Sequence, residues 1–356
     1  MHPIDGRFCF TQDLLINIYM YKPLLALVAA ALLFASCHHT APQEPIRLQG
    51  QAQGTFYSIV YYDSLFRDFQ PQIDSILHAF DQVASLWVDS SELQRLNRNE
   101  TDVLSPMITD LFEKSSDICR YTDSAFNIFI GPLVTAWGFS FKEREELSPQ
   151  RIAQLMTYTH GRWQINQNAQ GQKILAKEYP QMQADFNAIA QGYTVDRIAQ
   201  WLSRQGIQNY LVDVGGEVIA RGAKPDGTPW KVGIERPAED KDAAPQVELT
   251  IALRDCSVVT SGSYRKYYEK DGTRYSHTID PATGHPVSHS LLSVSVIDPD
   301  SWRADALATA FMVMGLDKAL QFIESHPQNP AVFFIYHQDG QYKTLATPEF
   351  SKLIIQ

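Results

Sequence analysis

Residues 209–221 read NYLVDVGGEVIAR, and this stretch decides the fold class. Two β-rich runs, 209–214 and 217–221, are separated only by Gly215 and Gly216. Two glycines between apolar runs are typical of a tight hairpin turn, because such a turn needs positive φ angles. A hairpin joins antiparallel strands, so this part of the chain is not a βαβ unit.

The rest of the chain extends this reading in both directions. The pattern predicts helices at 66–86, 106–122, 149–156, 188–205, 302–315 and 316–325. It predicts further strands at 54–62, 230–235, 246–253, 256–260, 264–269, 273–279, 291–297 and 331–336, with a second turn signal at Asp271-Gly272. Helices and strands mix without regular alternation, so we expect an α+β fold with mixed or antiparallel sheets in one large domain, 48–356.

The composition excludes two classes of protein. Apolar residues make up 44% of the 356 residues, which is enough for a packed core and excludes a disordered chain. The formal net charge is −10, whereas a nucleic-acid binder needs a basic face, so we expect no nucleic-acid partner.

The N-terminus has the layout of a secretory signal. Lys22 precedes the uncharged run 23–36, which is too short to cross a bilayer comfortably, and Cys37 follows two small residues. This arrangement resembles a bacterial lipoprotein signal, in which the cysteine carries lipid. We therefore expect a signal at 1–36, of which 1–19 reads as an extension before a start at Met20, and a lipidated tether at 37–47. An uncleaved anchor helix is the alternative, and both readings place the body outside the cytoplasm, in the cell envelope and facing the periplasm.

Two further cysteines, Cys119 and Cys256, belong to the expected domain. They could pair in an oxidising compartment, but two buried free thiols are the favoured reading.

An Asp lies in the apolar helix 302–315. Burying Asp305 costs free energy unless a cation or hydrogen bonds meet its charge. Thr309 is four residues on, so both oxygens project from one face and suit a hard cation such as Mg²⁺. The alternative is that Asp305 belongs to the first helical turn and that Thr309 bonds back to a carbonyl.

The segment 185–196 reads DFNAIAQGYTVD and predicts a strand that enters a helix. Small residues near a helix start let a ligand approach exposed backbone groups. The alternative is that Asp185 or Asn187 is only the N-cap.

His277 lies in the predicted strand 273–279, before an Asp-Pro…Gly turn. It could act as a general base or be a structural histidine. A hydrolase triad of Ser261, His277 and Asp280 is disfavoured because no Gly-x-Ser-x-Gly elbow follows a strand here.

The aromatic stretch 125–139 could wall a planar ligand or simply be core. The sequence contains no P-loop, no dinucleotide-binding glycine motif and no Cys/His cluster with zinc spacing.

Each motif is weak alone, but their order along one chain is specific. The blocks are GTFYS at 54–58, SEL at 91–93 with Leu96-Asn97, GPLV at 131–134 with WGF at 137–139, Asp185 with Gly192-Tyr193 and Asp196, VGGE at 214–217, TSG at 260–262, SHTIDPATGHP at 276–286, and Ala304-Asp305 with Thr309. Together they resemble the FAD:protein FMN transferase family, the ApbE-like flavin transferases, from about residue 48 to 345. The resemblance implies a single T-fold-related domain.

The resemblance also implies an activity. Enzymes of this family bind FAD and Mg²⁺, transfer the FMN moiety to a threonine hydroxyl of an acceptor protein and release AMP, and the acceptors include subunits of electron-transport complexes. The implied metal contacts are Asp305, Thr309 and the carbonyl of Ala188, and the implied general base is His277. The implied FAD contacts are Gln53, Trp87, Ala125, Phe126, Asn127, Asp185, Gln191, Thr278 and Ile279.

Four positions depart from the family pattern: Gln53 where Met is usual, Asn127 where Asp is usual, Phe129 where Thr is usual, and Gln191 where a charged residue is common. Activity is expected, with altered FAD affinity or acceptor choice. The alternatives are a Mg²⁺-dependent FAD pyrophosphatase that makes FMN and AMP, and a non-catalytic flavin-binding lipoprotein.

Overall fold

The computed structural model describes residues 44–140, 144–237, 246–262, 267–270, 273–326 and 330–355. Glu44 to Gln356 form one compact unit. The expected signal and most of the expected tether, together with the turn at Asp271-Gly272, lie outside the described residues. No helix of the described residues is long and apolar enough to span a membrane.

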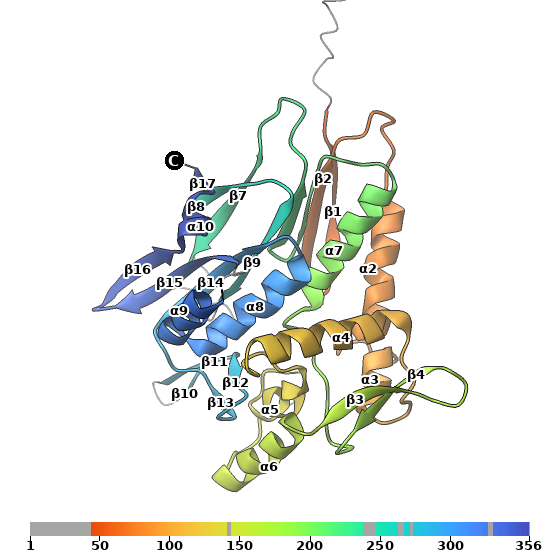
Figure 1. Ribbon diagram of the computed structural model, residues 1–356, viewed down its shortest axis with the longest axis vertical. Helices are drawn as coiled ribbons and strands as arrows, with labels where there is room; N and C mark the ends of the chain where they lie inside the picture. Colours follow the sequence, from red (N-terminus) through yellow and green to blue (C-terminus); the bar gives the residue numbers. More distant parts are fainter. Residues whose placement is uncertain are drawn as a thin grey trace, which may run out of the picture. The chain divides into compact units, whose positions relative to one another are not determined.

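An eight-stranded antiparallel sheet forms the centre of this unit (Figure 1). Its strands, in spatial order, are β1 (Ile46–Ala52), β2 (Thr55–Tyr61), β5 (Tyr210–Val214), β6 (Glu217–Arg221), β9 (Cys256–Gly262), β14 (Leu291–Asp298), β15 (Ala331–Gln338) and β16 (Gln341–Ala346). The predicted hairpin is β5–β6, and both of its turn glycines have positive φ. The α+β prediction is confirmed.

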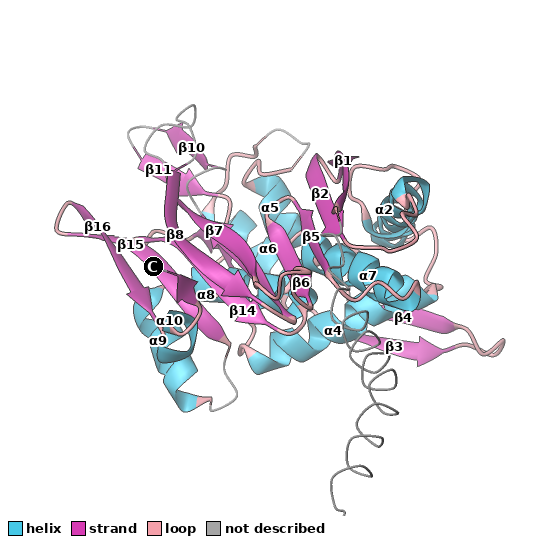
Figure 2. Ribbon diagram, turned by 90° about the horizontal axis from the view of Figure 1, so that it is seen from above, coloured by secondary structure: helices cyan, strands magenta, loops and turns pink. Residues whose placement is uncertain are grey.

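Helices cover one face of this sheet, and a small second sheet covers the other (Figure 2). The covering helices are α2 (Gln70–Ala84), α4 (Pro106–Tyr121), α7 (Ala190–Arg204), α8 (Ser301–Met314) and α9 (Leu316–Ser325). The second sheet contains β7 (Trp230–Arg236), β8 (Gln246–Leu253) and β17 (Ile354–Ile355), with α10 (Pro348–Ser351) beside it. Strands β6, β9, β14 and β15 are therefore buried on both faces, which explains their continuous apolar runs.

The remaining elements form small satellites. They are α3 (Glu92–Asn97), η1 (Ile128–Ile130), α5 (Gly131–Ala136), α6 (Pro149–Thr159), and the hairpins β3 (Trp163–Gln167) with β4 (Lys173–Lys177), β10 (Tyr267–Lys270) with β11 (Thr273–Ser276), and β12 (Ile279–Asp280) with β13 (His285–Pro286). Helices α5 and α6 pack with β12 around Trp137, whose indole N–H donates to the Gly284 carbonyl at 2.8 Å. The stretch 125–139 is thus largely core.

Two expectations about elements are corrected. The predicted strand 273–279 ends at Ser276, because the chain turns there into the separate β12–β13 hairpin, and His277 lies between the two elements. No strand leads directly into α7, since residues 182–186 form a loop.

Cys119 and Cys256 are both free and half-buried, as favoured from the sequence. Burial raises the pKa of both thiols.

Candidate active site

The start of α7 lies directly against the second turn of α8. The backbone N–H of Gly192 donates to Oδ2 of Asp305 at 3.0 Å. A β-carbon at Gly192 would lie 2.8 Å from the Asp305 Cβ, so only glycine allows the two helices to approach this closely. The sequence indicated that Asp305 is buried, and in the structure its carboxylate accepts a hydrogen bond from a residue of another helix.

Asp305 is buried with a single hydrogen-bond donor from the described chain. Burial is the largest cause that raises its pKa, to about 7, and the nearby Asp196 raises it further, while the Gly192 N–H opposes both. The first turn of α8 contains no acidic residue, so the alternative reading of Asp305 as a first-turn residue is wrong. A buried carboxylate whose charge is poorly compensated is a site where a cation would bind favourably.

Thr309 lies one turn further along α8 and is half-buried. Its hydroxyl pairs with the Ser261 hydroxyl of β9 at 3.3 Å, rather than with a carbonyl of its own helix among the described residues. Asp305 and Thr309 therefore present two oxygens from one face of α8, as the spacing predicted.

Ala188 supplies a third oxygen next to α7. Ala188 precedes Ile189, the N-cap of α7, so no N–H of a regular helix turn is due to bond to its carbonyl, and the Gly192 N–H donates to Asp305. No donor within the described chain bonds to the Ala188 carbonyl, so this carbonyl is available to a ligand. A carboxylate, a hydroxyl and a free carbonyl are hard oxygen ligands of the kind that Mg²⁺ takes, with water or phosphate oxygens completing its shell.

Asp185 lies just before this carbonyl and is buried. Its Oδ1 accepts the Asn187 N–H at 2.8 Å, and its own N–H donates to the Ile128 carbonyl at 2.7 Å. Burial raises the pKa of Asp185. The N-cap of α7 is Ile189, so neither Asp185 nor Asn187 has the capping role that was the alternative reading.

The turn of the β1–β2 hairpin reaches the same helix start. Gln53, with φ of 53°, donates from Nε2 to the Thr194 hydroxyl at 2.7 Å, and its buried Oε1 has no partner in the described chain. Gln191 lies over the β5–β6 turn so closely that a β-carbon at Gly215 would collide with its amide nitrogen. Both expected flavin contacts therefore flank the start of α7.

Other expected flavin contacts serve the fold as well. Asn127 donates to the Thr159 carbonyl at 3.1 Å and accepts the Phe129 N–H at 2.8 Å, and Phe126 belongs to the core while Ala125 packs against it. Trp87, which follows α2, has a side chain that is 68% exposed.

His277 is half-buried beside β12, the strand that also contacts α8. The ring of Phe139 lies edge-on to its imidazole, with centroids 6.5 Å apart. The Thr278 carbonyl accepts the Val287 N–H at 3.0 Å, and Ile279 is buried. The Asp280 carboxylate accepts a hydrogen bond from the Ala282 N–H within its own turn, which argues against a role for Asp280 in a hydrolase triad.

The contacts of Gly192, Asp196 and Ser261 with α8 could not be predicted from the sequence. Each touches α8 from another element, and no local pattern reveals such a partner. In the described residues no cluster of three or more His, Cys, Asp or Glu side chains could hold a metal.

The family model for the ApbE family matches residues 53–334. The chain belongs to the ApbE family. It is 34% identical over 339 residues to the FAD:protein FMN transferase of Haemophilus influenzae, covering 92% of this chain and 96% of the relative. It is also 34% identical over 347 residues to that of Escherichia coli K12, covering 93% and 97%.

Solved ApbE structures have the same fold. The flavin transferase ApbE from Vibrio cholerae superimposes with a TM-score of 0.75 at 32% identity, over 88% of this chain and all of the other. The apo flavinyl transferase ApbE of Pseudomonas stutzeri gives a TM-score of 0.76 at 32% identity, over 88% and 98%. As a member of the ApbE family, the protein is an enzyme of the transferase class.

Proposed function

We propose that the protein transfers the FMN moiety of FAD to a threonine hydroxyl of an acceptor protein and releases AMP, with Mg²⁺ at the α7–α8 junction. The observation that carries this proposal is the set of three oxygens on Asp305, Thr309 and Ala188, one of them a carbonyl with no donor among the described residues. The names of the ApbE relatives support the choice of flavin substrate and protein acceptor.

The reaction exchanges the phosphoanhydride bond of FAD for a phosphoester bond to threonine. The threonine oxygen forms a bond to the phosphorus of the FMN half, the bond from that phosphorus to the bridging oxygen breaks, and AMP leaves with this oxygen. Mg²⁺, when bound, neutralises charge on the diphosphate. Phosphoryl transfer needs positioning and charge neutralisation more than covalent help from the protein.

The residues of the chain take separate parts in this scheme. His277 accepts the proton that the threonine hydroxyl loses. Gln53 and Gln191 flank the start of α7 and orient the substrate beside the metal oxygens, and Trp87 covers the flavin. The acceptor is a protein of an electron-transport complex, and Cys37 anchors the enzyme by lipid to the cell envelope, facing the periplasm.

The test is incubation of the purified protein with FAD, Mg²⁺ and an acceptor protein that contains the threonine to be modified. We expect covalent FMN on the acceptor by mass spectrometry and an equal amount of AMP. AMP without labelled acceptor, while a known transferase labels it in parallel, would favour the pyrophosphatase. Intact bound FAD in the complete mixture would mean a flavin-binding protein.

A further inference from the structure

The rotation of α8 about its own axis is not set by hydrophobicity. Every residue from Ala304 to Ala308 is buried, so the helix has no exposed face in this turn. A helix that is apolar all round has no polar face to select its rotation in the core. Specific polar contacts therefore help to fix the direction in which Asp305 points.

The first such contact lies at the start of α8. Asp300 is the N-cap residue, but within the described chain its carboxylate makes no capping bond. The first two N–H groups of the helix instead donate to Asp196 of α7, from Ser301 to Oδ1 at 3.0 Å and from Trp302 to Oδ2 at 2.9 Å. A carboxylate is favoured there because it satisfies unpaired N–H groups at the positive end of the helix dipole.

In the second contact the two helices exchange roles, so that α7 donates and α8 accepts. Gly192 lies one turn before Asp196 on α7, and its N–H donates to Asp305, which lies one turn after Ser301 on α8. Each helix thus presents N–H groups of its first turn to a carboxylate of the other. The two contacts are about 6 Å apart along antiparallel helices, so together they restrict both rotation and axial position.

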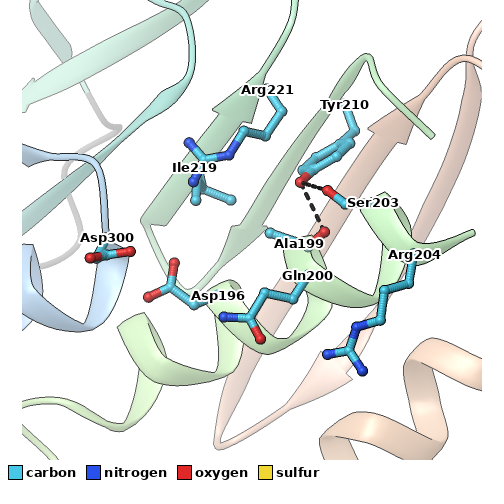
Figure 3. A pocket seen from close by; sticks show the side chains of 9 residues that line it. All are labelled: Asp196, Ala199, Gln200, Ser203, Arg204, Tyr210, Ile219, Arg221 and Asp300. Carbon is cyan, nitrogen blue, oxygen red and sulfur yellow. Dashed lines mark hydrogen bonds between the residues drawn. The ribbon is translucent and has the colours of Figure 1, made fainter. Parts of the chain in front are cut away.

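We propose that Asp196 is a positioning residue: by capping α8 from α7, it aims Asp305 and Thr309 at the bound metal. This inference rests on the proposed function, because it concerns how the metal oxygens are held. Asp196 also lines an open pocket of about 290 Å³ together with Asp300 and Arg221 (Figure 3). Water can reach the two N–H groups through this pocket when the carboxylate is removed, so a variant there is expected to fold.

The test compares Asp196→Ala and Asp196→Asn with Asp63→Ala in the full-length protein. Asp63 is the control, because it is equally buried and accepts two backbone N–H groups, from Leu65 and Arg67, besides its ion pair with the Arg67 guanidinium, and it lies just after β2 rather than on α7. Mg²⁺ affinity is measured by titration calorimetry with FAD present and no acceptor. Because loss of a residue that orients metal ligands typically weakens binding by about 10- to 100-fold, we expect this loss for Asp196→Ala. We expect a smaller loss for Asp196→Asn, which keeps one accepting oxygen, and none for Asp63→Ala.

A second measurement reports the helix contact without metal. Hydrogen–deuterium exchange of the Gly192 amide should accelerate in Asp196→Ala relative to the wild type and to Asp63→Ala. Unchanged Mg²⁺ affinity together with unchanged exchange would overturn the positioning role while leaving the proposed function intact. Wild-type protein that binds no Mg²⁺ would overturn the proposed metal chemistry itself, and this inference with it.

Discussion

Replacing Gly192 by Ala tests the close approach of α7 and α8 with a single methyl group. The added Cβ would lie 2.7 Å from the carbonyl carbon of Ser301 and 2.8 Å from the Cβ of Asp305. Neither atom is the end of a flexible side chain. Because ordinary contacts begin near 3.4 Å, the helices must separate by about 1 Å, which breaks the 3.0 Å bond from Gly192 to Asp305.

The expected cost in stability is modest. Overpacking a core costs about 1–3 kcal/mol, and alanine in place of glycine in a helix returns about 1 kcal/mol. The expected net loss is about 0–2 kcal/mol, which leaves the protein folded. The Mg²⁺ affinity should also fall, by about 10- to 100-fold, because Asp305 moves away with α8 and no longer points at the metal position.

Gly206→Ala at the other end of α7 is the matched control. Its β-carbon meets nothing within 4 Å, but its φ is +85°, so the substitution strains the backbone by roughly 1–2 kcal/mol without touching α8. Thermal unfolding and Mg²⁺ titration are measured on both variants. Wild-type Mg²⁺ affinity in Gly192→Ala would refute the claim that this contact sets the metal oxygens.

Three further predictions concern charge and proton transfer. Burial raises the pKa of Asp305 to about 7 and that of Asp196 to about 6. Because the folded protein then holds these protons more tightly than the unfolded chain, the two groups contribute most to the free energy of unfolding below about pH 4. Without metal, this contribution is lost as the pH rises through 6 to 7. Mg²⁺ favours the ionised Asp305, so it should raise the unfolding temperature more at pH 8 than at pH 5, and equal gains would contradict this. Asp305→Asn should make the metal-free protein more stable at pH 8 than the wild type and should abolish FMN transfer; a stability that still falls as steeply with pH would place the titrating group elsewhere. His277→Ala should slow transfer by about 10²- to 10⁴-fold while FAD affinity, measured by fluorescence quenching, stays near that of the wild type; parallel losses would indicate a structural histidine.

Elements with strong periodicity were predictable from the sequence. The apolar positions of 66–86 fall on one helical face, and α2 buries four of them: Ile73, Leu77, Phe80 and Ala84. The β5–β6 hairpin follows directly from its two glycines. The β3–β4 hairpin was missed, because Trp163–Gln167 and Lys173–Lys177 are short, mostly polar runs that pair only with each other.

The site was predictable only in part. Asp305 could be found because a charge in an apolar helix is costly wherever the helix packs. Its partner Gly192 and the cap at Asp196 could not be found, because they depend on which helix packs against which. The spacing of His277 suggested a strand, but the chain leaves β11 one residue earlier to form the β12–β13 hairpin.

The β1–β2 hairpin separates the entry of the chain from the site. The chain enters at Ile46, beside Tyr61, whereas the turn at Gln53 meets the start of α7. A strand of this length spans about 23 Å, and the residues from Cys37 to Ile46 add at most about 30 Å. For an enzyme anchored at Cys37, as proposed, these two lengths together set an upper limit of about 50 Å on the height of the Gln53 turn above the lipid. Acceptor threonines held much farther from the membrane surface would then be out of reach.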